Sequence, residues 1–226
     1  MPGRRIAAFD FDGTLTRRDT LVPFLARACG MAELTRAVRR VAPLAAKART
    51  GRLDSELHHR DASKEALLQH LLAGREASWL EQEGRRFATT LGARLRPEMQ
   101  EQLRWHREAG HELIIVSASL EAYLIPFAAA HGFDHVIAVR MESGGSGRLT
   151  GRLEGPNVRG PEKAVRLRSW LDGDRPEVLW AYGNSSGDRE LLAMADVPVW
   201  VAGRRRAATA PAQGRERSLE GRTSVA

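Results

Sequence analysis

The chain has 226 residues, enough for one domain or for a core with a smaller inserted domain, and its 42% hydrophobic and 28% charged residues are ordinary for a globular protein. Its single cysteine, Cys29, excludes an intramolecular disulfide, and no apolar stretch reaches the ~20 residues needed to span a bilayer. Because the first apolar run is interrupted at Asp10 and no signal peptide precedes it, we expect a cytoplasmic protein.

The net charge of +7 is unevenly distributed. Residues 204–226 contribute +4 and lack apolar periodicity, which leaves only +3 for the rest of the chain. This pattern predicts a disordered basic tail. Since we find no folded basic face, we expect no nucleic-acid partner.

The first predicted element is a buried strand, an apolar run from Ile6 that ends at Asp10 and Asp12. Ligands of parallel sheets bind at the carboxyl ends of the strands, and Gly13 allows the chain to turn closely around one. Two adjacent carboxylates repel each other, and a hard divalent cation such as Mg²⁺ relieves that repulsion. The alternative is an Asp-Gly turn in which the aspartates only cap.

Residues 10–14 resemble the first signature of the haloacid dehalogenase-like hydrolases, most of which are Mg²⁺-dependent phosphatases. The longer stretch from Phe9 to Thr16 resembles the phosphoserine phosphatase-like branch of that family. The resemblance implies that Asp10 is the nucleophile and Asp12 the general acid and base. It also implies a small helical cap inserted after the first strand.

The next stretch, residues 18–95, carries only helical patterns, at 19–29, 32–49, 54–72 and 76–91. We therefore predict a helical cap at 18–95 and a core formed by 1–17 and 96–203. Pro43 suggests a kink or a break in the second helix. One side of that helix is basic (Arg36, Arg39, Arg40, Lys47 and Arg49). We favour a solvated face over a pocket for an anionic substrate or a membrane-surface face.

After a helix from Pro97, a second buried strand at 111–117 ends in Ser117, and a helix follows from Leu120 to about His131. A hydroxyl beside a helix start suits phosphate binding. Ser119 is a candidate for the same phosphate or for the helix cap. Ser117 matches the second signature of the family.

A third strand at 135–140 and a Gly-rich hairpin at 143–155 come before a helix that opens at Gly160-Pro161. Lys163 lies in the first turn of this helix, where the helix dipole disfavours a cation. Two interpretations are possible: an anion lies near Lys163, or the lysine is an ordinary surface residue. The residue matches the family's third signature, a lysine that anchors the nucleophile and the phosphate. Asn157 and Arg159 are weaker candidates for substrate contact.

A fourth strand at 177–183 leads to Asn184 and Asp188, and a short strand at 197–201 follows. This loop matches the fourth signature, except that Asn184 stands where the family usually has a metal-binding aspartate. The resemblance implies a metal site formed by Asp10, Asp12, Asn184 and Asp188, with Mg²⁺ as the cofactor. It also implies that phosphate is bound by Ser117, Lys163, Thr14 and Ser119.

The alternation of strands and helices predicts an α/β fold with a doubly wound parallel sheet. The expected function is hydrolysis of a small phosphomonoester. A phosphotransferase is the first alternative, because an alcohol can replace water in the second step. A non-catalytic protein that binds a phosphorylated ligand is the other, and only Asn184 favours it.

Overall fold

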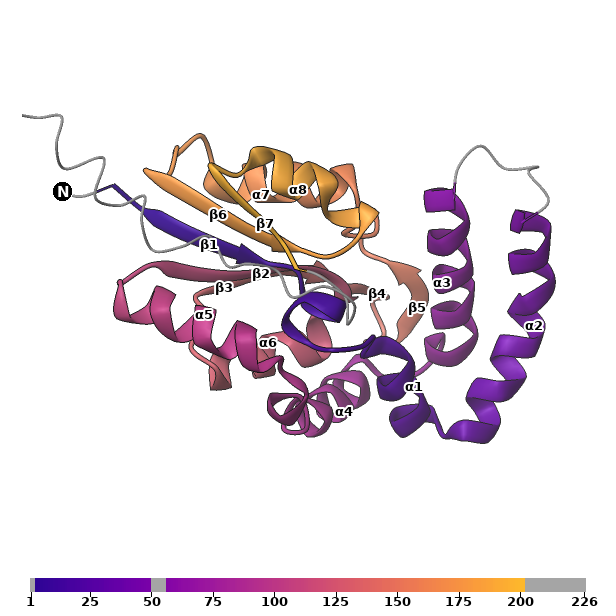
Figure 1. Ribbon diagram of the computed structural model, residues 1–226. Helices are drawn as coiled ribbons and strands as arrows, with labels where there is room; N and C mark the ends of the chain where they lie inside the picture. Colours follow the sequence, from indigo (N-terminus) through magenta and orange to yellow (C-terminus); the bar gives the residue numbers. More distant parts are fainter. Residues whose placement is uncertain (1–2, 50–55, 202–226) are drawn as a thin grey trace, which may run out of the picture.

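The computed structural model describes residues 3–49 and 56–201, so the tail predicted at 204–226 lies outside the described residues. Within them, five parallel strands form one sheet in the order β3-β2-β1-β6-β7 (Figure 1). Their bounds are Arg5–Phe9 for β1, Glu112–Leu120 for β2, His135–Val139 for β3, Val178–Gly183 for β6 and Val197–Trp200 for β7. The predicted parallel sheet is confirmed.

Helices cover both faces of this sheet, as a doubly wound fold requires. Strand β1 lies at its centre, and the chain moves outward from it in both directions. The pairs α5–α6 and α7–α8 lie on opposite faces of the sheet (Figure 1). The bounds are Pro97–Glu108 for α5, Glu121–Ala130 for α6, Pro161–Leu171 for α7 and Arg189–Met194 for α8.

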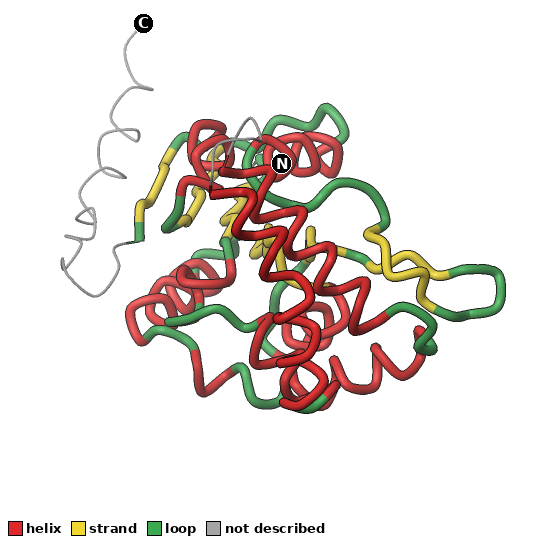
Figure 2. Tube along the Cα trace, turned by 90° about the vertical axis from the view of Figure 1, so that its right-hand side faces the viewer, coloured by secondary structure: helices red, strands yellow, loops and turns green. Residues whose placement is uncertain are grey.

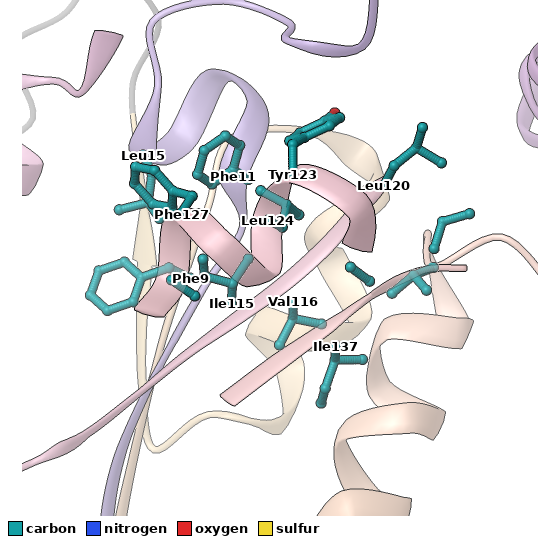
Figure 3. Close-up of a cluster of buried hydrophobic side chains, with 14 of the residues drawn as sticks. Phe9, Phe11, Leu15, Ile115, Val116, Leu120, Tyr123, Leu124, Phe127 and Ile137 are labelled. Carbon is teal, nitrogen blue, oxygen red and sulfur yellow. The ribbon is translucent and has the colours of Figure 1, made fainter. Parts of the chain in front are cut away.

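The core lies between the central strands and α6. Strand β1 is buried from Ile6 to Phe9, and Ile115 and Val116 of β2 are fully buried beside it. Figure 3 shows their side chains gathered with those of α6 in one apolar cluster. A strand that is apolar on both faces can bury both only between two helical layers, which explains why β1 takes the central position.

A helical insertion connects β1 to α5. Its helices are α1 (Leu21–Cys29), α2 (Met31–Arg49), α3 (Glu56–Leu72) and α4 (Ala77–Ala88). Helices α2 and α3 pack side by side opposite the carboxyl ends of the strands, as Figures 1 and 2 show, whereas α4 packs on α6. The predicted hairpin is present as β4 (Met141–Ser143) and β5 (Leu149–Leu153), and it packs against α3. The proposed domain boundaries remain a prediction.

Two details differ from the sequence-based expectations. Helix α2 continues through Pro43, so of the predicted kink or break the break is absent. Strand β2 continues to Leu120, which takes the N-cap position of α6 without a side-chain cap, so the prediction that Ser119 caps this helix is wrong. None of the described helices is long and apolar enough to cross a membrane.

A buried polar chain lies behind β1. The two rings of His106 and His111 approach at 2.8 Å through their Nδ1 atoms, and His106 Nε2 lies 2.9 Å from the hydroxyl of Tyr182. The ring of Tyr182 stacks on Phe9 at 4.3 Å between centroids. Burial, with a contribution from His111, lowers the pKa of His106 to about 3. The imidazole is therefore neutral in the folded protein.

This neutral imidazole makes stability depend on pH. In the unfolded chain the histidine has a pKa of about 6.5, so between pH 6.5 and 3 the unfolded state binds a proton that the folded state does not. Stability is therefore lost as pH falls, by about 1.4 kcal/mol per pH unit from this group. We expect urea unfolding at pH 7, 6 and 5 to show this loss in the wild type relative to His106→Phe, which cannot titrate. Parallel pH profiles of the two proteins would contradict it.

Candidate active site

The carboxyl ends of the three central strands bring the predicted residues together. Strand register pairs Phe9 with Ile115 of β2 and with Tyr182 of β6, so Asp10 after β1, Ser117 in the last part of β2 and Asn184 after β6 lie at nearly the same level of the sheet. Asp10, Ser117 and Asn184 all line one cavity at this edge. The cavity has a volume of about 850 Å³, and residues of α2 and α3 form part of its wall.

Lys163 lies at the floor of this cavity between two carboxylates. Its Nζ is 2.6 Å from Asp10 Oδ1 and 2.6 Å from Asp188 Oδ1, and all three residues are at least nine-tenths buried. Burial by itself lowers the pKa of Lys163, but the two carboxylates outweigh it and raise that pKa. The lysine that the sequence placed in an unfavourable helix turn thus has its anions, and it is charged.

The two carboxylates differ in electrostatic environment. Burial raises the pKa of Asp10 despite its contact with Lys163. Burial by itself also raises the pKa of Asp188, but Lys163 and hydrogen bonds from Ser185 outweigh burial and lower that pKa. Its Oδ2 accepts hydrogen bonds from the Asn184 and Ser185 backbone N–H groups and from the Ser185 hydroxyl, at 2.8–3.1 Å. Both oxygens of Asp188 are therefore in use within the protein.

Thr14 and Gly13 position the first carboxylate. The Thr14 hydroxyl donates to Asp10 Oδ2 at 2.8 Å and lies 3.3 Å from Asn184 Oδ1. Thr14 is fully buried and is not part of the cavity wall, so its contact is with Asp10. Gly13 has a φ of +84°, and a Cβ there would lie 2.2 Å from Asn184 Nδ2. Only glycine permits this turn and this approach of the two loops.

Asp12 is held apart from the Lys163 cluster. The Thr20 hydroxyl donates to its Oδ1 at 2.7 Å and the Ser119 hydroxyl donates to its Oδ2 at 2.5 Å. Burial raises the pKa of Asp12 to about 7, although these two hydrogen bonds act in the opposite direction. A carboxyl group with a pKa near neutrality can both give and take a proton.

The donor set suits a hard cation. Asp10 Oδ2 and Asn184 Oδ1 both approach the Thr14 hydroxyl, so a carboxylate and an amide oxygen converge on one side of the cluster. Such oxygens are the ligands that Mg²⁺ prefers. Among the described residues there is no group of three or more His, Cys, Asp or Glu arranged around a metal position. The oxygens of Asp10 and Asn184 thus fit Mg²⁺, and the full ligand set of Asp10, Asp12, Asn184 and Asp188 stays a prediction.

The two serines of β2 have different contacts. Ser117 is almost fully buried at the cavity wall, and its hydroxyl oxygen accepts a hydrogen bond from the Ser119 N–H at 3.1 Å. Its own hydroxyl proton can point into the cavity. The Ser119 hydroxyl is used on Asp12, so Ser119 holds that carboxylate.

Sequence reasoning missed a bridge between α3 and the core. Lys64 Nζ donates to Asn157 Oδ1 at 2.6 Å and to the Ala118 carbonyl, and Asn157 Nδ2 donates to Asp61 Oδ1 at 2.6 Å. Burial lowers the pKa of Lys64 to about 8. One signal was available: Lys64 precedes Leu67, Leu68 and Leu71 by three, four and seven residues, which puts a lysine on the apolar stripe of its helix.

The three described arginines on the basic side of α2 do not contribute to the cavity. Arg36, Arg39 and Arg40 are exposed and absent from the cavity wall, whereas Arg159, the weaker candidate, is part of it. This favours the solvated face over the anion pocket. The side chains of Lys47 and Arg49 lie outside the described residues.

The comparisons with known proteins agree with this geometry. A family model described as haloacid dehalogenase-like hydrolase matches residues 7–193, a stretch that contains every candidate site residue. Protein CicA of Caulobacter vibrioides is 35% identical over 192 residues, which cover 84% of this chain and 83% of that protein.

Two further relatives extend the comparison. Phosphoserine phosphatase of Archaeoglobus fulgidus is 27% identical over 198 residues, which cover 87% of this chain and 52% of that enzyme. The solved structure of a protein of unknown function from Bordetella pertussis Tohama I superimposes with a TM-score of 0.69 at 29% identity, over 85% of this chain and 87% of that one.

Proposed function

This chain belongs to the haloacid dehalogenase-like hydrolase family, and on that premise we propose that it is a Mg²⁺-dependent phosphomonoester hydrolase that works through an aspartyl-phosphate. The observation that carries the proposal is the separation of two carboxylates at one cavity floor. Asp10 contacts Lys163 at 2.6 Å, whereas Asp12 is held by two hydroxyl groups and has a pKa near 7. One group is suited to attack and the other to proton transfer.

In the first step, an Asp10 carboxylate oxygen bonds to phosphorus and the bond from phosphorus to the ester oxygen breaks. The protonated Asp12 gives its proton to the leaving alkoxide. Ser117 and Lys163 donate hydrogen bonds to the phosphoryl oxygens, whose charge must be offset in the transition state. Lys163 also orients Asp10 and favours its ionised form against the effect of burial, because its ammonium group lies against that carboxylate.

In the second step, water attacks phosphorus and Asp12 takes its proton. The bond between phosphorus and Asp10 breaks, and inorganic phosphate is released. Asp12 thereby returns to the protonated form that starts the cycle, as a general acid and base must. Its hydroxyl partners, Ser119 and Thr20, keep the carboxyl group in one orientation during both proton transfers.

Asp10, Asp12 through its backbone carbonyl and side-chain region, Asn184 and Asp188 would hold Mg²⁺, which when bound would offset phosphate charge. Asp188 remains a predicted ligand, and its contacts with Lys163 and with the Asn184–Ser185 backbone would orient its carboxylate.

The direct test is phosphate release from a generic aryl phosphate, measured with added Mg²⁺ and with a chelator. Turnover with Mg²⁺ that the chelator abolishes and fresh Mg²⁺ restores is the expected result. Adding an acceptor alcohol and analysing products separates hydrolysis from phosphotransfer. Absence of turnover at every Mg²⁺ concentration would favour the non-catalytic binding protein.

Asn184 offers a sharper test of the metal site. Asn184→Asp adds a negative charge beside Asp10, so we expect the Mg²⁺ concentration for half-maximal thermal stabilisation to fall by about tenfold. The increase in Tm with Mg²⁺ measures this without turnover. Asn157→Asp is the matched control, since it adds the same charge to another residue of the cavity wall. An equal response of the two variants would refute a metal ligand role for Asn184.

The substrate class that the relatives support is a phosphomonoester, since the Archaeoglobus relative is a phosphoserine phosphatase. We keep a small phosphorylated molecule as the expected partner and a cytoplasmic location as the expectation from the sequence.

A further inference from the structure

The cavity wall has two chemically distinct parts. The core contributes polar side chains, among them Asp10, Asp12, Ser117 and Lys163. Every residue that α1 and α2 contribute is apolar: Leu21, Val22, Val38, Val41 and Ala42. The cavity is therefore polar at the end that would hold phosphate and apolar on the side that those two helices form.

The sequence of α2 produces this wall. Val38, Val41 and Ala42 have the i, i+3, i+4 spacing of one helix face, while Arg36, Arg39 and Arg40 lie on the other side and are exposed. Because α2 also carries these exposed arginines, its orientation decides that the apolar face and not the charged face lines the cavity. Val38 is 49% exposed and Val22 is 50% exposed, so both side chains keep surface that a ligand can contact.

The charged groups that α3 brings to the cavity already have partners. Lys64 donates to Asn157 and to the Ala118 carbonyl, and Asp61 accepts from the Asn157 amide. These contacts occupy two of the three Lys64 N–H donors and one Asp61 oxygen, which reduces what remains to recognise the charges of a small polar ester. Asp19, Ser63 and Arg159 also line the cavity, so the apolar residues of α1 and α2 form one continuous side of the space that the rest of a ligand would occupy.

Building on the proposed function, we propose that the cavity selects phosphate monoesters whose alcohol carries an apolar alkyl or aryl group. The phosphate lies at Asp10 and Lys163, and the apolar group lies along Val22, Val38 and Val41. A volume of about 850 Å³ is within the range of pockets that hold drug-sized ligands and exceeds the needs of a phosphate with a two- or three-carbon alcohol. Burying the exposed valines supplies the driving force.

Binding tests this independently of turnover, because alkylphosphonates keep the anionic head and cannot be hydrolysed. We expect calorimetry with ethyl-, butyl- and hexylphosphonate to show Kd falling about two- to fourfold per added methylene group. A Kd that is the same for all three would overturn the proposal. Preferential hydrolysis of O-phosphoserine over hexyl phosphate would overturn it as well.

A matched pair of variants locates the apolar group. Val38→Asn changes the wall, and Val165→Asn makes the same change at a helical valine of similar exposure, 52% against 49%, outside the cavity. We expect Val38→Asn to raise the Kd of hexylphosphonate about fivefold and to leave that of ethylphosphonate unchanged, and Val165→Asn to alter neither. Equal losses for both ligands, or no loss, would refute the assigned wall.

The two proposals fail in different ways. If aryl phosphate is hydrolysed but the Kd of the phosphonates does not depend on alkyl length, the proposed hydrolase is supported and the apolar selection is refuted. If the Kd falls with alkyl length but the protein never releases phosphate, the selective cavity is supported and the proposed hydrolase is refuted.

Discussion

Replacing Asp10 with Asn abolishes phosphate release, with an expected fall in kcat of at least about 10⁴-fold, as for the loss of other enzymatic nucleophiles. The amide has nearly the shape of the carboxylate but does not attack phosphorus. Its oxygen can accept from Lys163 while its N–H₂ group faces Thr14, so the local contacts survive in altered form. Lys163 also keeps its second partner, Asp188.

Unfolding of Asp10→Asn is measured beside its turnover, to show that the loss of turnover does not arise from loss of the fold. We expect Asp10→Asn to unfold cooperatively, and Asp174→Asn, the same change at an exposed carboxylate paired with Arg4, to keep full turnover. Acid quenching of the wild type during turnover should give a peptide containing Asp10 that is heavier by one phosphoryl group. A phosphorylated peptide from elsewhere, or an active Asp10→Asn protein, would refute the mechanism.

Much of the fold and of the reactive end was predictable because the signals are local. The apolar run from Ile6 could be buried only as a central strand, and that strand delivers Asp10 to the sheet edge by its register with β2 and β6. Lys163 was predictable for an electrostatic reason: a cation in a first helical turn needs an anion nearby. The structure supplies two carboxylates at 2.6 Å.

The rest depends on how separate segments meet, which local patterns do not encode. Ser119 is predicted to bind phosphate or to cap the helix, and the cap is excluded because β2 runs three residues further than the pattern indicates. The Ser119 hydroxyl instead donates to Asp12, a contact between separate segments. Lys64 reaches Asn157 only because α3 lies across the strand ends. The orientation of α2 likewise decides that its valines face the cavity and its arginines face solvent.

Lys163→Met is expected to have the largest effect on stability. Methionine fills nearly the same space, but it leaves Asp10 and Asp188 buried without their shared cation. Removing one partner of a buried ion pair costs about 3–5 kcal/mol. We therefore expect urea unfolding at pH 7 to show a loss of about that size in the free energy of unfolding, along with loss of turnover because the phosphoryl oxygens lose a donor.

A second substitution separates charge from packing. If the loss arises from two uncompensated carboxylates, Lys163→Met combined with Asp188→Asn should be more stable than Lys163→Met alone, since one of the two charges is then absent. Lowering the pH toward 5 should narrow the gap between Lys163→Met and the wild type, because a carboxyl group deprived of its cation takes up a proton. The double variant should remain without turnover, because it also lacks the Lys163 ammonium group. A double variant no more stable than Lys163→Met would instead assign the loss to packing around the lysine stem.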